Sequence, residues 1–160
     1  MELRFRVAGR IAKPVAEVFE AVADPKKLSN YFTTGGAEGR LETGATVYWD
    51  FADFPGRFPV KVVEVVPNEK IVLKWEAYEG EGPNESGELP EAGGYDTVVT
   101  MLFEGLDDGR TLVSIFEEGW RQTAAGLKGS YNNCEGWTGM LCAMKMWVEH
   151  GINLREGFYK

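Results

Sequence analysis

The sequence predicts an α+β fold in which an antiparallel β-sheet wraps around one long C-terminal helix, with two short helices after the first strand. Strand-like segments follow one another from residue 45 to residue 120, and the connections between them are too short for parallel crossovers. From Asn133 to about residue 157, apolar side chains recur at helical spacing. A strand-rich protein that ends in such a helix buries this apolar stripe most simply against its own sheet.

The first elements are a strand and two helices. Apolar residues alternate with polar ones over residues 3–11, the period of a half-buried strand. Pro14 then begins a helix, because a missing N–H is tolerated at that position, and apolar spacing continues it to Val22. Asp24 and Pro25 are residue types preferred at the N-cap and first position of a helix, so they predict a second, short one.

Five strands are predicted in the middle of the chain from alternation and from β-branched and aromatic content: Thr46–Phe54, Arg57–Val66, Ile71–Ala77, Tyr95–Glu104 and Arg110–Trp120. Pro, Gly, Asn and Asp mark the turns between them, at residues 53–57, 67–70 and 107–109. The segment from Arg121 to Asn132 is predicted as a loop that leads into the final helix, because it is rich in small residues.

One segment differs from the rest in composition. Residues 79–94 contain five glutamates, two prolines and no basic residue, which predicts a flexible, solvated acidic loop. A surface insertion without a function is one interpretation of this loop. A lid over a cavity, or a contact surface for a basic partner, is the other.

Length and charge limit the classes of function. A chain of 160 residues is predicted to form a single domain over residues 1–160. Its net charge of −8 and pI near 4.8 argue against binding to nucleic acids or to anionic membrane surfaces. The sequence has neither an apolar run of membrane-spanning length nor a secretory signal, so we expect no membrane insertion and a cytoplasmic location.

Motifs for metal binding and catalysis are missing from the sequence. Cys134 and Cys142 are separated by roughly 12 Å along the predicted helix, which is too far for a disulfide. With one histidine, His150, on the polar side of that helix, neither a zinc site nor another cofactor is expected. No serine-nucleophile elbow or phosphate loop is present. We therefore assign no catalytic or metal-binding residue, and the sequence favours a protein that is not an enzyme.

Several segments of the chain carry a family resemblance in their order: residues 14–19 (PVAEVF), 24–32 (DPKKLSNYF) and 63–76 (VEVVPNEKIVLKWE). The first two resemble the first helices of the START/Bet v 1-like (SRPBCC) superfamily, and the third resembles its central hairpin. Residues 136–141 (GWTGML) and 149–151 (EHG) resemble the end of the branch called activator of Hsp-90 ATPase homologue-like. The resemblance covers nearly the whole chain. It implies a helix-grip fold, which in this superfamily encloses an apolar cavity.

The leading functional hypothesis is the binding of a small hydrophobic or amphipathic ligand, such as a lipid, between the sheet and the final helix, without catalysis. The predicted ligand-cavity residues are mostly aromatic, with the first two near the entrance: Tyr31, Phe32, Trp49, Phe51, Trp75, Trp120, Trp137, Leu141, Met144 and Val148. A solid core is the competing interpretation of the same side chains. The alternatives are a protein-interaction or co-chaperone-like module that uses the acidic surface, and a cyclase- or hydrolase-type enzyme of the same superfamily. An enzyme requires a group of polar residues inside the cavity, and the sequence pattern identifies none.

Overall fold

Seven antiparallel strands form one sheet in the order β1-β7-β6-β5-β4-β3-β2 in the computed structural model, which describes residues 1–79 and 91–160. The strands are β1 (Arg4–Ile11), β2 (Gly36–Glu38), β3 (Thr46–Phe51), β4 (Phe54–Val66), β5 (Lys70–Glu79), β6 (Glu91–Gly105) and β7 (Thr111–Glu118). The helices are α1 (Val15–Ala23), α2 (Pro25–Leu28) and α3 (Ala124–His150). This arrangement confirms the predicted α+β fold.

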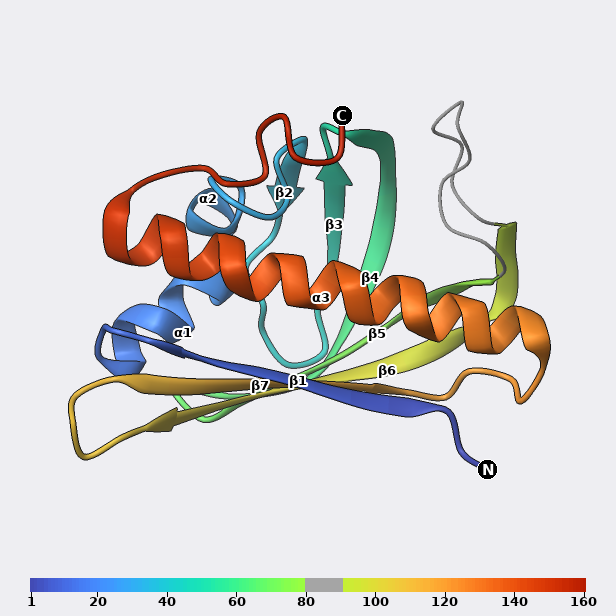
Figure 1. Ribbon diagram of the computed structural model, residues 1–160, viewed down its shortest axis with the longest axis horizontal. Coiled ribbons are helices and arrows are strands. Elements are labelled where there is room, and N and C mark those ends of the chain that lie inside the picture. The colour runs from blue at the N-terminus through green and yellow to red at the C-terminus, as the bar shows by residue number, and fades with distance from the viewer. Residues whose placement is uncertain (80–90) are drawn as a thin grey trace.

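The sheet curves around α3 (Figure 1). β1, β7 and β6 run beneath the helix in this view, whereas β3 and β4 rise beside it. α1 and α2 lie near the C-terminal end of α3, and the residues after α3 pass back toward β2 and β3. The core fills the space that the sheet, α1 and α3 enclose, with contributions such as Val18, Val113, Ile115 and Met144. None of the helices in the described parts of the chain has the length and apolarity that crossing a membrane requires.

The short helices begin where the sequence predicts. Pro14 is the N-cap of α1, and the side chain of Asp24 caps α2 by accepting a hydrogen bond from the backbone N–H of Lys26 at 2.9 Å. Pro25 is the first residue of α2. This second helix is a single turn, which directs the chain from α1 toward the short edge strand β2. β2 has only three residues and was not predicted, because so short a segment has no periodicity.

The start of α3 is the largest difference from the prediction. The helix begins at Ala124, where Thr123 caps it, so the segment that was expected to be a loop up to Asn132 is helical. Its glycines are there for close packing: a Cβ at Gly129 would lie 2.6 Å from the carbonyl oxygen of Tyr78, at the end of β5. α3 then ends at Gly151, in the left-handed conformation, instead of continuing to residue 157.

The turn between β3 and β4 also differs from the prediction. Phe51 pairs with Phe54, so the chain turns at residues 52–53, and the Pro55–Gly56 pair lies inside β4 instead of at the turn. Gly56 has a φ of 147°, and its N–H donates to a carboxylate oxygen of Asp50 at 3.1 Å. The conformation that only glycine adopts easily is thus used within the strand and not at the turn.

The predicted acidic loop falls mostly outside the described residues. Glu79 is the last residue of β5, and residues 91–94 belong to β6, so both ends of the segment are strands. The other predicted strands and turns are confirmed to within a few residues. The turn at residues 107–109 contains Gly109 with a φ of 84°.

Candidate functional site

An aromatic cluster lies between α3 and the strands β3, β4 and β5. Neighbouring ring centroids in it are 5.0–5.9 Å apart, in edge-to-face and tilted arrangements. Its members are Phe32, Trp49, Phe51, Phe58, Trp75 and Trp137. Strand alternation turns these side chains of β3, β4 and β5 toward the helix, and Trp137 meets them from α3.

Burial within the aromatic cluster changes from one end to the other. Trp49 and Trp137 are 1% and 2% exposed, whereas Phe51, Phe58 and Trp75 are only half-buried. We call these last three side chains the outer rings. The aromatic cluster therefore reaches the surface at the outer rings, and its other end is closed by the core.

A buried carboxylate adjoins the aromatic cluster. Glu117, on β7, is completely buried and accepts hydrogen bonds on both oxygens. Its Oε2 accepts from Nε1 of Trp75 at 2.8 Å and from the hydroxyl of Thr97 at 2.6 Å. Its Oε1 accepts from Nε1 of Trp137 at 2.8 Å, and the amide nitrogen of Asn133 lies 3.0 Å from each oxygen. Residues of β5, β6 and α3 are thus joined to one side chain of β7.

Two opposing effects act on the charge of Glu117. Burial raises the pKa of this carboxyl, and the hydrogen bonds from Thr97, Trp75, Asn133 and Trp137 lower it in part. Within residues 1–79 and 91–160, no lysine, arginine or histidine pairs with Glu117, so its charge is balanced only by neutral donors. In its ionised form, this carboxyl gives its surroundings a negative potential.

Five of the ten predicted ligand-cavity residues meet in the aromatic cluster: Phe32, Trp49, Phe51, Trp75 and Trp137. Leu141 and Met144 are buried in the adjoining core, and Val148 packs against it. Eight of the ten side chains thus belong to the aromatic cluster or to the core next to it.

The other two predicted residues lie apart from the aromatic cluster's ring contacts. Tyr31 is buried, donates its hydroxyl to the carbonyl oxygen of Ala21 at 2.9 Å and stacks on Trp147. Trp120 stacks on Phe5 of β1 with a centroid separation of 5.5 Å. Both therefore have packing partners of their own.

Glu117 is the site residue that the sequence analysis missed. The sequence pattern identified no group of polar residues in the interior, whereas the structure brings Glu117, Thr97 and Asn133 together from three distant parts of the chain. One local signal was available. In β7, Glu117 has the same alternation parity as the buried Val113 and Ile115, so an acidic residue occupies an inward position on an apolar strand face.

The C-terminal segment, residues 152–160, covers one side of the aromatic cluster. Arg155 pairs with Asp53, its Nη2 donating to Oδ1 at 3.0 Å, and both side chains are only 10% exposed. The guanidinium carbon of Arg155 lies 4.6 Å from the ring centroid of Phe51 and 5.7 Å from that of Phe32. The hydroxyl of Tyr159 occupies the space left by the missing side chain of Gly139. The segment thus links the β3–β4 hairpin to α3.

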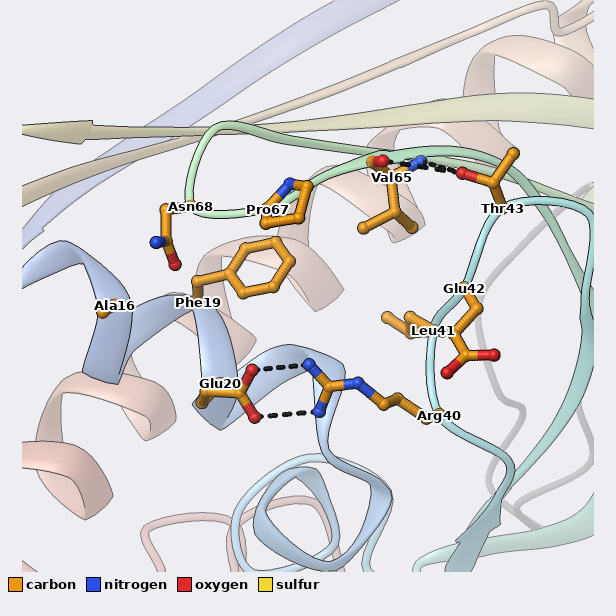
Figure 2. Close-up of a pocket in the computed structure, with 10 residues that line it drawn as sticks. All are labelled: Ala16, Phe19, Glu20, Arg40, Leu41, Glu42, Thr43, Val65, Pro67 and Asn68. Carbon is orange, nitrogen blue, oxygen red and sulfur yellow. Dashed lines mark hydrogen bonds and ion pairs between the residues drawn. The ribbon is translucent and has the colours of Figure 1, made fainter.

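Two grooves open on the surface. The first has a volume of about 490 Å³ and lies between α1 and the end of β4, where Phe19 and Pro67 face it and the Glu20–Arg40 ion pair borders it (Figure 2). The second, which we call the α3 groove, has a volume of about 530 Å³ and lies between α3 and the C-terminal segment. None of the ten predicted residues lines either groove, but Arg155 lines the α3 groove and also contacts the aromatic cluster.

The remaining reactive groups are dispersed. Cys134 and Cys142 are free thiols, as predicted, and both line the α3 groove. His150 is exposed at the end of α3. In the part of the chain that the structure describes, no three His, Cys, Asp or Glu side chains are grouped so that they could hold a metal ion.

Comparison with protein families gives one match: the family model described as "Activator of Hsp90 ATPase homolog 1-like protein" matches residues 12–145. A search of curated proteins found none that is similar.

Solved structures resemble the chain over most of its length. Protein SSP2350 from Staphylococcus saprophyticus is 23% identical, with 96% of each chain covered and a TM-score of 0.74. DynU16, from the dynemicin biosynthetic locus, is 23% identical, with 92% of this chain and 48% of DynU16 covered and a TM-score of 0.71. The Aha1 dimer from Colwellia psychrerythraea is 18% identical, with 93% of this chain and 98% of that chain covered and a TM-score of 0.68. At these identities the likeness establishes the fold alone.

Proposed function

This chain belongs to the family of activator of Hsp90 ATPase homolog 1-like proteins, and from that premise we propose that it binds a small, largely apolar ligand between its sheet and α3. The aromatic cluster beside the carboxylate of Glu117 supports this function. Small-molecule sites combine apolar and aromatic walls with a few fixed polar groups, and the cluster has this composition. The two free thiols, Cys134 and Cys142, fit a reducing compartment such as the cytoplasm.

The ligand enters from the α3 groove. Arg155 separates this groove from the outer rings, because its side chain lines the groove and stacks on Phe51. Movement of the C-terminal segment would join the groove to the aromatic cluster. The neighbouring Met144 is an unbranched side chain that can change rotamer to fit a ligand.

Binding without catalysis agrees with the chemistry around Glu117. Both of its oxygens are occupied by hydrogen-bond donors, so the carboxylate has no free lone pair aimed at a substrate. Its partners Trp75, Thr97, Asn133 and Trp137 do not titrate near neutral pH. General acid–base chemistry requires a group that can exchange a proton with the substrate, and these contacts leave neither oxygen of Glu117 free for such an exchange.

Thermal unfolding in the presence of a panel of sterols, fatty acids, flavonoids and aromatic amines tests this function. A ligand at about 100 times its Kd stabilises the folded state by roughly 2.7 kcal/mol. For a domain of this size that corresponds to a rise in Tm of about 5–10 °C. We expect one chemical class to produce such a shift, and a panel without any shift would argue against ligand binding.

Met144→Trp tests the location, because a larger side chain would fill the space next to α3 and abolish the shift. Met146→Trp is the matched control, since Met146 is only half-buried on the same helix. Undiminished affinity in a folded Met144→Trp variant would place the ligand elsewhere.

A protein-interaction module is the second candidate, because the net charge of −8 favours a basic partner. Such a complex would weaken as salt is added. Deletion of residues 81–93 should lower the affinity of this complex if the acidic segment contributes to the interface. An unchanged affinity would show that the segment is not part of the interface.

A further inference from the structure

We infer that the site between the sheet and α3 takes an organic cation: an amine, amidine or quaternary ammonium group carried on a compact apolar body. This inference rests on the proposed function, because it names the chemical class of ligand that the same site would bind. Three features of the molecule favour a positive charge at this place.

The first feature is that the aromatic cluster already holds a cation of the protein itself. The guanidinium carbon of Arg155 lies 4.6 Å from the ring centroid of Phe51 and 5.1 Å from that of Tyr159. Positive groups are attracted to ring faces, and this geometry is well within the range for that attraction. A ligand that displaces Arg155 from the outer rings would replace one organic cation with another.

The second feature is the carboxyl group behind the rings, which pairs with no basic side chain of residues 1–79 and 91–160. Trp75 and Trp137 donate their indole N–H groups to Glu117, and their ring centroids are 5.3 Å apart. An indole that donates to a carboxylate is polarised so that its ring face becomes more negative. An anion placed against these faces would be repelled, and a cation would be attracted by both the rings and the carboxylate.

The third feature is the carboxylate that the displaced arginine would leave behind. Asp53 and Arg155 pair through two contacts of 3.0 Å with little exposure to solvent. Once Arg155 moves away, Asp53 is a half-buried carboxylate at the edge of the site that needs a new counter-charge. The cationic group of the ligand would supply it. The net charge of −8 also raises the local concentration of cations at the surface.

Three probes with the same apolar body and different charge test the inference: naphthylmethylammonium, naphthylmethanol and naphthoate. Their dissociation constants are measured by calorimetry with the full chain at neutral pH. We expect the ammonium to bind at least tenfold more tightly than the alcohol, and the carboxylate to bind most weakly. Equal affinities, or preference for the carboxylate, would contradict the inference that the ligand is a cation but would leave the proposal of ligand binding intact. Failure of all three probes to bind would count against the proposed function itself, and therefore also against the inference of a cationic ligand.

Glu117→Gln removes the buried charge and should reduce the preference for ammonium over alcohol several-fold. Glu118→Gln is the control, because the neighbouring side chain points to the opposite face of β7 and the net charge changes equally. An unchanged preference in Glu117→Gln would show that the charge of Glu117 plays no part.

A second variant leaves the buried hydrogen bonds intact in case Glu117→Gln does not fold. Arg155→Gln removes the competing guanidinium and should tighten binding of the ammonium several-fold. Weaker binding in this variant would contradict the exchange of one cation for another.

Discussion

The indole nitrogen of Trp137 on α3 donates to Oε1 of Glu117 on β7 at 2.8 Å, and this hydrogen bond ties the helix to the sheet across the core. Three further donors meet the same carboxylate, from β5, β6 and α3. The position of α3 over the sheet is therefore specified by a polar network as well as by apolar packing.

Replacing Glu117 with glutamine should destabilise the fold by roughly 1.5–3 kcal/mol, the range for hydrogen bonds to a charged group. The amide of glutamine brings two N–H donors into a space that is already surrounded by donors. Urea unfolding at neutral pH measures the change, with Glu118→Gln expected to stay within about 0.5 kcal/mol of the wild type. A Glu117→Gln variant as stable as the wild type would mean that the network specifies the position of α3 without adding to the stability of the fold.

Stability should also depend on pH through Glu117. Burial raises the pKa of Glu117 in the folded protein above its ordinary value of 4.5. The folded state then binds this proton more tightly than the unfolded state does. The part of the stability that is linked to this proton is therefore fully present below pH 4.5 and is lost as pH rises through the folded-state pKa.

The difference in unfolding free energy between the wild type and Glu117→Gln, measured by urea titration over a pH series, isolates this effect. As pH increases, the unfolding free energy of the wild type should fall relative to that of Glu117→Gln. A shift in the opposite direction would show that the four donors outweigh burial.

Substitutions at two glycines of α3 should have different effects. A Cβ at Gly136 would contact nothing within 4 Å, so Gly136→Ala should stabilise the helix by about 0.5–1 kcal/mol. A Cβ at Gly139 would collide with the hydroxyl of Tyr159, so Gly139→Ala should gain less. Displacement of Tyr159 should also loosen the C-terminal segment.

Hydrogen exchange at residues 152–160 distinguishes the two variants, with faster exchange expected only in Gly139→Ala. Equal exchange in both would mean that Tyr159 does not anchor the segment.

Gly129→Ala should be more damaging than either change. A Cβ at Gly129 would lie 2.6 Å from the carbonyl oxygen of Tyr78 and 3.3 Å from the Cα of Glu79. Both atoms belong to the backbone of β5, so the clash can be relieved only by moving the helix away from the sheet. We expect a loss of more than about 1 kcal/mol, the scale for overpacking a tight contact, in a thermal or urea unfolding experiment. A neutral effect would mean that the helix end is free to shift.

The fold could be predicted because its signals are local or periodic. Asp24 and Pro25 identify α2 by their chemistry, and alternation identifies the strands without knowledge of their partners. The start of α3 could not be predicted in the same way. Gly126 and Gly129 are typical of a flexible linker in sequence, and only the approach of β5 explains why small residues are needed inside a helix.

The site was predicted in part for a related reason. Aromatic side chains such as Trp75 and Trp137 are apolar enough to be assigned to the interior one by one. The role of Glu117 depends on partners 20 or more residues away, such as Thr97 and Trp75. Periodicity along β7 predicts that the Glu117 side chain points inward. The hydrogen-bond donors that compensate for its burial depend on strand register and on the placement of α3, which periodicity does not give.

The pairing of β1 with β7 has a consequence for how the chain reaches its native state. Arg4 pairs with Glu118 and β1 lies at the edge of the sheet, so β1 has no strand partner until the chain has been synthesised as far as β7. Closing so long a loop costs chain entropy, and such non-local pairing slows folding. β7 also carries Glu117, whose donors on α3 emerge later still. The hydrogen bonds around Glu117 therefore form only after α3 has been synthesised, so a ligand at the proposed site would select chains in which α3 has docked on β7.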